Sequence, residues 1–458
     1  MGIAYGEERI LSELCLDFPR GSISLVTGQS GSGKSSLIKY INGIIPTFEP
    51  AVLQGDIFLD GRSIGKEGVD ARAAYISTVF QNPKTQFYAT RTTDEMAFAM
   101  ENQALEPEEI WARIDRYSRM LQLEHLLDRD IFKLSGGEKQ LVAVGSVACL
   151  DGEVYIFDEP SSSLDREAIL RLRHAMECLR DMGKIVIIAE HRLYYIADLA
   201  EQIIVLEEGR ACRIEGTGGD MHMLKERLQP YSLRSLRETE REANVRRKKK
   251  GLFAKESDLT ERLQCRDFCF GYRRNRILFD FDIGFDKGIY FLAGANGIGK
   301  STFLRCLCGL QVCKGAKIYC DGKLLRRPAE AVFLVMQDVH YQLFTESVWE
   351  EISLVSEDAC AKEAVLRDLD LWEKKDLHPA ALSGGQKQRL LLGMSLLSVK
   401  PVIVMDEPTS GLCRKSMEKT MEILRRLEEA GKTVLIVSHD DEFIRACGKE
   451  LIEFVQNE

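Results

Sequence analysis

The sequence predicts an α/β protein with mainly parallel sheets, and three observations support this fold class. Short apolar runs alternate along the chain with amphipathic segments of helical period. Two of these runs, Val154–Phe157 and Val402–Met405, are apolar throughout, as in strands that are covered on both faces. The glycine-rich pattern G-x-x-x-x-G-K-[ST] occurs twice, at Gly28–Ser35 and Gly294–Ser301. We therefore expect two units of the same design.

The elements follow the same order in both halves. Each glycine-rich loop should follow a strand, Ile23–Thr27 in the first half and Ile289–Ala293 in the second, and should lead into a helix. Two further apolar strands, Ile185–Ala189 and Val434–Val437, each end shortly before a histidine. The apolar run Leu390–Val399 is too short to span a bilayer and predicts a buried helix.

The repeat can be measured from residue numbers. Three pairs of matching residues are each 248 positions apart: Ser135 and Ser383, Glu159 and Glu407, and His191 and His439. The loop lysines Lys34 and Lys300 are instead 266 positions apart. The second copy is therefore 18 residues shorter between its glycine-rich loop and Ser383. Surface loops tolerate deletions of this size.

Composition excludes several classes of protein. A formal net charge of −9 creates no global basic field, so we expect no nucleic-acid partner. No run approaches the roughly 18–20 apolar residues of a membrane span, and the charged residues Glu7–Arg9 argue against a secretion signal. The 13 cysteines include no C-x-x-C pair, which favours reduced, packed thiols over a zinc site.

We expect a first domain over residues 1–233, a charged linker over 234–258 and a second domain over 259–458. The linker contains the basic run Arg246–Lys250. Such a run favours a solvated tether, and the alternative is a contact with lipid headgroups or with a partner.

Both glycine-rich loops suit a nucleoside triphosphate. Backbone N–H groups at a helix N-terminus supply positive potential without bulk, and glycine lets the backbone approach closely. Lys34 and Lys300 should reach the β- and γ-phosphates, and Ser35 and Ser301 should bind Mg²⁺. The predicted loop contacts to ATP are Gly28, Ser30, Gly31, Ser32, Gly33, Lys34, Ser35 and Ser36, and then Gly294, Asn296, Gly297, Ile298, Gly299, Lys300, Ser301 and Thr302.

Paired carboxylates complete the predicted chemistry. Asp158 and Asp406 end buried strands, where holding Mg²⁺ through water is a natural role for a carboxylate. The next residues, Glu159 and Glu407, should polarise the attacking water. The segments LSGGE and LSGGQ each begin a long helix whose N-terminus suits phosphate, so each should serve the nucleotide of the other half. Their predicted contacts are Ser135, Gly136, Gly137 and Glu138, and Ser383, Gly384, Gly385 and Gln386.

Together these motifs resemble a tandem pair of ABC-type ATPase domains over nearly the whole chain outside the linker. The resemblance implies a RecA-like core with a mainly parallel sheet, an antiparallel β subdomain and a helical signature subdomain in each half. It also implies a head-to-tail intramolecular pair that encloses two ATP molecules. The family pattern assigns roles to six further residues: Gln81 and Gln337 as Mg²⁺-sensing Q-loop residues, His191 and His439 as switch histidines, and Tyr5 and Tyr272 as adenine-stacking aromatics.

The Q-loops carry a narrower resemblance. QNPKTQFYATRTTDEMAF, from Gln81 to Phe98, resembles ATPases of energy-coupling factor (ECF) transporters, and QDVHYQLFTESVWEEI, from Gln337 to Ile352, resembles their second half. The resemblance implies that residues around Gln81–Ala97 and Gln337–Glu351 grip a membrane T component at the cytoplasmic face of the cell membrane. A small substrate-binding membrane protein would then capture a vitamin or a transition metal ion. Because the 18-residue difference includes the Q-loop region, we expect the two grips to differ.

One position departs from the family pattern. The D-loop of the first half ends in Asp165, whereas the second half has Cys413, which lacks a carboxylate's charge. Both halves keep their catalytic motifs, so we expect two hydrolysing sites of unequal rate. Two alternatives remain, the ATPase of a sugar importer and a ribosome-associated tandem ABC protein. The intact second signature disfavours the first, and the short linker and SSSLD disfavour the second.

Overall fold

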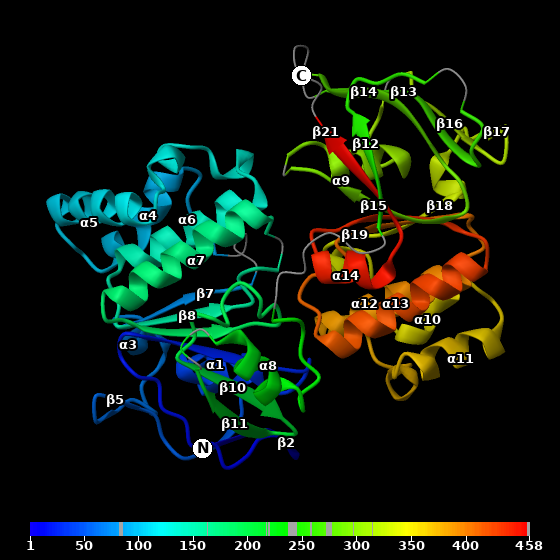
Figure 1. Cartoon of the computed structure of the whole chain (residues 1–458). Coiled ribbons are helices and arrows are strands. Elements are labelled where there is room, and N and C mark those ends of the chain that lie inside the picture. The colour runs from blue at the N-terminus through cyan, green and yellow to red at the C-terminus, as the bar shows by residue number, and fades with distance from the viewer. Residues whose placement is uncertain are drawn as a thin grey trace. The chain divides into compact units, whose positions relative to one another are not determined.

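In the computed structural model the chain folds as two compact units, Met1–Glu238 with Cys413–Lys415, and Thr239–Leu412 with Ser416–Glu458 (Figure 1). The structure describes residues 1–81, 86–162, 164–216, 218, 220–236, 245–256, 259–271, 277–295, 297–313 and 315–455. Each unit contains one six-stranded sheet that is mainly parallel. The predicted α/β fold is confirmed.

The main sheet of the first unit has the strand order β11-β10-β3-β9-β8-β7. Only β11 runs antiparallel to its neighbour. The central strands are buried along nearly their whole length, which explains their continuous apolar sequences. Its strands are β3 (Ser22–Gly28), β7 (Ile76–Val79), β8 (Val154–Asp158), β9 (Ile185–Ala189), β10 (Gln202–Glu207) and β11 (Arg210–Glu215).

Two smaller substructures flank this sheet. Antiparallel strands β1 (Gly2–Tyr5), β2 (Glu8–Leu11) and β4 (Val52–Gln54) form one sheet, and β5 (Phe58–Leu59) pairs with β6 (Arg62–Ser63). Helices α4, α5 and α6 gather in a group of their own (Figure 1). The helices are α1 (Lys34–Ile41), α2 (Ile44–Thr47), α3 (Val69–Arg72), α4 (Thr92–Asn102), α5 (Pro107–Met120), α6 (Gly136–Cys149), α7 (Arg166–Asp181) and α8 (Met221–Leu228).

The second unit repeats this plan. Its main sheet has the order β12-β21-β15-β20-β19-β18, and a separate antiparallel sheet has the order β14-β13-β16-β17. Figure 1 shows that second sheet and helices α10 and α11 at opposite ends of the unit. The strands are β12 (Arg246–Gly251), β13 (Leu263–Gly271), β14 (Ile277–Phe285), β15 (Gly288–Ala293), β16 (Lys317–Cys320), β17 (Lys323–Leu324), β18 (Val332–Val335), β19 (Val402–Asp406), β20 (Thr433–Val437) and β21 (Glu450–Val455). The helices are α9 (Lys300–Leu307), α10 (Val348–Ser353), α11 (Ala359–Asp368), α12 (Gly384–Leu397), α13 (Arg414–Glu429) and α14 (Asp441–Cys447).

The basic run of the predicted linker is a strand and not a solvated tether. Strand β12 pairs in parallel with β21 at the edge of the second main sheet, which places this part of residues 234–258 in the second unit. Most of its side chains are exposed, and Lys248 forms an ion pair of 2.7 Å with Glu450. Charged side chains suit an edge strand because they discourage pairing with other chains.

Each unit has its own buried apolar residues around the main sheet. Among the described residues, no helix has the length and apolar character needed to cross a membrane. All 13 cysteines lie in the described part of the chain, and none forms a disulfide. The described part of the chain also contains no group of three or more His, Cys, Asp or Glu side chains that could hold a metal ion.

Candidate functional sites

Both glycine-rich loops lie between a central strand and a helix, as predicted. The Nζ of Lys34 donates to the carbonyl oxygens of Gly28 and Gln29, at 3.1 and 3.0 Å. Lys300 repeats this geometry on the carbonyl oxygens at the start of its own loop, at 2.7 and 3.0 Å. Gly33, with φ of 96°, must be glycine, because an added Cβ would lie 2.5 Å from Leu11 Cδ2. The described residues of the two loops therefore hold the lysine in the same way.

The donor set fits ATP with Mg²⁺. In the second unit the Ser301 Oγ lies 3.2 Å from Asp406 Oδ1, so the two predicted metal-binding side chains are adjacent. Burial raises the pKa of Asp158 to about 6 and raises that of Asp406, and a bound cation would favour the charged form of both. The buried Ser32 hydroxyl lacks a hydrogen-bond partner among the described residues, which leaves it available to phosphate. When bound, Mg²⁺ neutralises charge on the phosphates.

Both predicted catalytic glutamates have an unusual backbone conformation. Glu159 has φ of 45° and Glu407 has φ of 50°, in the left-handed region that residues other than glycine seldom adopt. Their N–H groups donate to the carbonyl oxygens of Ala189 and Val437, at 2.8 and 2.9 Å, so the neighbouring strand holds each turn. Strain of this kind is concentrated at functional sites. Burial, and then the charge of Glu190, raise the pKa of Glu159.

The two predicted switch histidines lie against these glutamates. The His191 Nε2 is 3.6 Å from Glu159 Oε1, and the corresponding distance from His439 to Glu407 is 3.8 Å. Burial, and then the charge of Lys34, lower the pKa of His191 well below its ordinary value, so the ring is neutral near pH 7. The amide of Gln81 donates to Glu159 Oε2 at 2.8 Å, which joins the first Q-loop to the same carboxylate.

The signature segments begin α6 and α12 with capping boxes. The Ser135 Oγ accepts from the N–H of Glu138 at 3.3 Å, and Glu138 Oε2 accepts from the N–H of Ser135 at 2.8 Å. Ser383 and Gln386 form the same pair, at 3.4 and 3.0 Å. Glu138 and Gln386 thus shape the helix start, and their contact with the nucleotide of the other half stays a prediction. The glycines between them leave the helix N-terminus open to an anion.

The two Q-loops have equal length, and their described residues share two sets of contacts. Gln81 and Glu95 are 14 positions apart, as are Gln337 and Glu351, so the 18-residue difference lies on either side of the Q-loop. The following glutamines, Gln86 and Gln342, each fold back on the preceding strand. Gln86 contacts the Phe80 N–H and the Thr78 oxygen, both at 3.1 Å, and Gln342 contacts the Met336 N–H at 3.0 Å and the Leu334 oxygen at 2.5 Å.

A buried glutamate on the next helix fixes the far end of each Q-loop. Glu95 accepts from the N–H groups of Tyr88 and Ala89, both at 2.8 Å. Glu351 accepts from the N–H groups of Phe344 and Thr345, both at 3.0 Å. The two Q-loops therefore share the contacts at their described ends, and the expectation that the two grips differ stays a prediction.

The structure also describes the surroundings of Tyr5, a predicted adenine contact, and of Asp165 in the first D-loop. Tyr5 lies on β1 with its hydroxyl 3.4 Å from the Ser36 Oγ, beside the helix that follows the first glycine-rich loop. Asp165 is the N-cap of α7 and accepts from the Ala168 N–H at 2.9 Å. Cys413 precedes α13 at the matching position. Tyr272 and Asn296 lie outside the described residues.

Sequence reasoning missed the residues that connect the histidine loops to the glutamate turns. In the first unit the Ser161 Oγ donates to Glu190 Oε2 at 2.6 Å. In the second the Thr409 Oγ1 donates to Asp440 Oδ2 at 2.9 Å. The available signal was an acidic residue beside each histidine, but its partner is about 30 positions away in the chain.

Comparison with known proteins agrees with this geometry. The family model described as "ABC transporter" matches residues 11–162 and 279–410. A protein of Treponema denticola, provisionally described as an ABC transporter ATP-binding protein, is 36% identical over 97% of this chain and 92% of its own length. A Bacillus subtilis protein, provisionally described as an HMP/thiamine import ATP-binding protein, is 28% identical over 97% of this chain and 87% of its own length.

A solved structure shares the two-domain fold. The structure titled "RNase-L Inhibitor" aligns with a TM-score of 0.62 and 21% identity, over 97% of this chain and 86% of its own. The family match extends over parts of both units, and it includes both glycine-rich loops and both glutamates that were predicted to be catalytic, Glu159 and Glu407. The chain therefore belongs to the ABC transporter family as a tandem ATPase, which binds ATP with Mg²⁺ and hydrolyses it.

Proposed function

We propose that this chain is the energising subunit of an ECF-type importer at the cytoplasmic face of the cell membrane. Its partners would be a T-type membrane protein and a small membrane protein that binds a vitamin or a transition metal ion. ATP would lie between the glycine-rich loop of one half and the signature of the other. Binding and hydrolysis would close and reopen the pair and so move the attached membrane helices.

The observation that carries the proposal is the construction shared by the two Q-loops. Each loop is fixed at both ends by a glutamine and a buried glutamate, and each presents an exposed aromatic ring at the same position. Tyr88 is 76% exposed and Phe344 is 74% exposed. Tyr88 also stacks on Phe98 with ring centroids 4.9 Å apart, which orients its ring. A fixed loop with an exposed aromatic side chain suits the docking of an amphipathic partner helix.

The description of one relative also supports the proposal of an ECF-type importer. The Bacillus subtilis protein is described as a thiamine import component, and thiamine is a vitamin. The likeness to the RNase-L inhibitor, at 21% identity, supports the fold and gives no support to a ribosomal role. No described residue favours a sugar importer over the ECF type.

Co-purification tests the proposal. The intact chain, co-expressed with the T-type membrane protein of an ECF transporter, should be recovered with it from detergent-solubilised membranes. The double variant Tyr88→Ala with Phe344→Ala should lose most of this recovery because both docking rings are removed. Phe58→Ala is the matched control, since Phe58 is 62% exposed but lies on β5, away from the Q-loops. Recovery with ribosomes or with a sugar permease instead would refute the proposal.

A further inference from the structure

One buried carboxylate in each unit joins the loop of the switch histidine to the turn that carries the catalytic glutamate. We call the carboxylate residue, together with the hydroxyl residue that donates to it, the carboxylate bracket. It consists of Glu190 and Ser161 in the first unit and of Asp440 and Thr409 in the second. Ser161 and Thr409 each follow the catalytic glutamate by two positions.

In the first unit, Glu190 is 2% exposed and both of its oxygens accept hydrogen bonds. Oε1 accepts from the backbone N–H groups of His191 and Arg192, at 2.8 and 3.0 Å. Oε2 accepts from the hydroxyls of Ser161 and Tyr195, at 2.6 and 3.0 Å. A buried carboxylate is costly unless it is hydrogen-bonded in this way, so these contacts fix the conformation of the histidine loop.

In the second unit, Asp440 is 4% exposed and makes the link from the other side of the histidine. Its Oδ2 accepts from Thr409 Oγ1 at 2.9 Å, and its Oδ1 accepts from the N–H of Phe443 at 3.2 Å, which caps α14. Its own N–H donates to the Ser438 Oγ at 3.1 Å.

The two brackets are not built from matching residues. At the spacing of 248 positions, Glu190 corresponds to Ser438 and Arg192 corresponds to Asp440. The carboxylate has therefore moved from the position before the histidine to the position after it. In the first unit the Arg192 Nη1 instead donates to the carbonyl oxygen of Ser161, at 3.2 Å. Because two different arrangements produce one link, the link itself is the common requirement.

We propose that Glu190 and Asp440 are positioning residues for hydrolysis, each holding the switch histidine of its own unit against the catalytic glutamate. The ring nitrogens of the histidines lie 3.6 and 3.8 Å from the carboxylates of Glu159 and Glu407. A displacement of about 1 Å at such a contact can lower the rate by about a hundredfold. The inference depends on ATP hydrolysis alone and not on the transporter partner.

The test uses the purified full-length chain. Glu190→Ala should lower kcat to about the value of Glu159→Gln, the variant that lacks the catalytic carboxylate of the same unit. The Kd for a fluorescent ATP analogue should change by less than about threefold, since the glycine-rich loop is intact. Asp440→Ala should behave in the same way relative to Glu407→Gln.

Two further variants separate positioning from general structure. Glu190→Gln keeps an oxygen for the two backbone N–H groups but loses an acceptor for Ser161, so its kcat should be intermediate. The double change Glu190→Ser with Arg192→Asp copies the second unit and should recover at least half of the original kcat. Tyr195→Phe removes one contact of Glu190 but leaves its link to Ser161, so its kcat should fall less than that of Glu190→Ala.

Three results would overturn the inference. The first is a kcat for Glu190→Gln and Glu190→Ala equal to that of the original chain. The second is a loss that appears wholly in nucleotide binding. The third is a copied bracket whose kcat is no higher than that of Glu190→Ala although its thermal unfolding matches the original. If Glu190→Ala does not fold, Glu190→Gln and Asp440→Asn decide the matter by the same comparison.

Discussion

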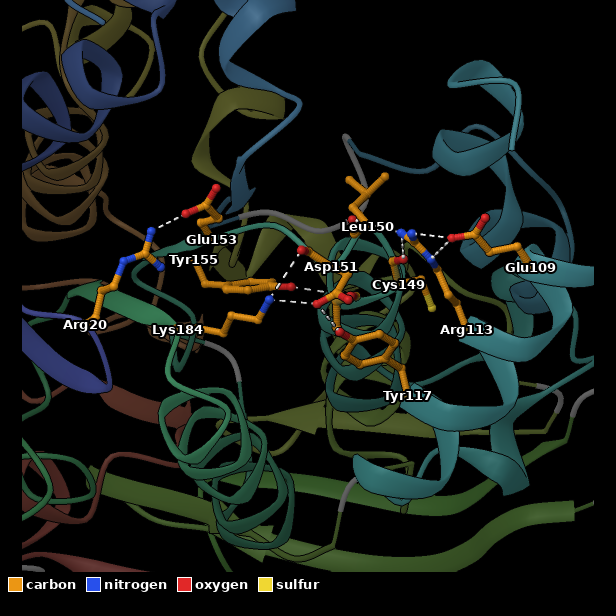
Figure 2. A network of polar contacts seen from close by, with 11 residues as sticks. Arg20, Glu109, Arg113, Tyr117, Cys149, Leu150, Asp151, Glu153, Tyr155 and Lys184 are labelled. Carbon is orange, nitrogen blue, oxygen red and sulfur yellow. Dashed lines mark hydrogen bonds and ion pairs between the residues drawn. The ribbon is translucent and has the colours of Figure 1, made fainter. Parts of the chain in front are cut away.

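Replacing Asp151 with asparagine should destabilise the first unit in a pH-dependent manner. Asp151 lies between α6 and β8, where its Oδ1 accepts from Lys184 Nζ at 2.7 Å and from the Tyr117 hydroxyl at 2.6 Å (Figure 2). Asp151 has φ of 54°, a conformation that asparagine also tolerates, so the substitution leaves the backbone unstrained. The corresponding residue of the second unit is Val399.

Asp151→Asn should lower the free energy of unfolding of the first unit by about 1 kcal/mol. Hydrogen bonds to charged groups contribute about 1.5–3 kcal/mol when buried. The Asp151 side chain is 32% exposed, which reduces that figure, while Tyr117 is fully buried and keeps its need for an acceptor. Asparagine retains an oxygen for the hydroxyl of Tyr117, so the change removes mainly the attraction to Lys184.

The sign of the pH dependence follows from the pKa of Asp151. Burial alone would raise that pKa, but the contacts with Lys184 and Tyr117 outweigh burial and lower it. The stabilisation is therefore present above the ordinary aspartate value, about 4, and is lost as the pH falls through the lower folded-state value. The difference between the original chain and Asp151→Asn should be largest near pH 7 and should shrink below about pH 4.

Urea unfolding followed through Trp111 measures this effect. The chain has three tryptophans, and replacing Trp349 and Trp372 with phenylalanine leaves a signal from α5 of the first unit. Asp115→Asn is the control, because Asp115 is on the same helix in an exposed ion pair and should change the free energy of unfolding by less than about 0.5 kcal/mol. The reasoning would be refuted if Asp151→Asn changed the free energy of unfolding by less than about 0.3 kcal/mol at pH 7. It would also be refuted if the change were as large below about pH 4 as at pH 7.

Three other predictions concern the sites. Cys413→Asp should stabilise the second unit by about 1 kcal/mol, because aspartate would cap α13. Asp165→Ala should destabilise the first unit by a similar amount, because it removes the cap of α7. Thermal unfolding measures both changes, and a fall in stability for Cys413→Asp would contradict this prediction. Glu159→Gln and Glu407→Gln, made singly, should both lower steady-state turnover but to different extents, so an unaffected rate in either variant argues against two active sites. Gly33→Ala should weaken ATP binding by tenfold or more, because its Cβ would clash with the first antiparallel sheet; calorimetry that finds an unchanged Kd would exclude that clash.

Much of each site could be predicted because its motifs are short and belong to particular elements. A glycine-rich loop needs a strand before it and a helix after it, and an acidic pair needs the end of a buried strand. The positions of Lys34, Asp158 and Glu159 follow from these local rules. The basic strand β12 could not be predicted in the same way, because a run of lysines and arginines is normally solvated. Its pairing partner, β21, lies about 200 positions further along the chain.

The sequence by itself determined the duplication, the α/β fold and the ATPase class of the chain, since repeated spacing and local motifs contain that information. Only the tertiary structure decided how the histidine loops are held. Glu190 and Asp440 stand on opposite sides of their histidines, and nothing local indicates that both reach the turn after the catalytic glutamate. Contacts of this kind depend on the pairing of parallel strands, which brings distant segments to the same edge of a sheet.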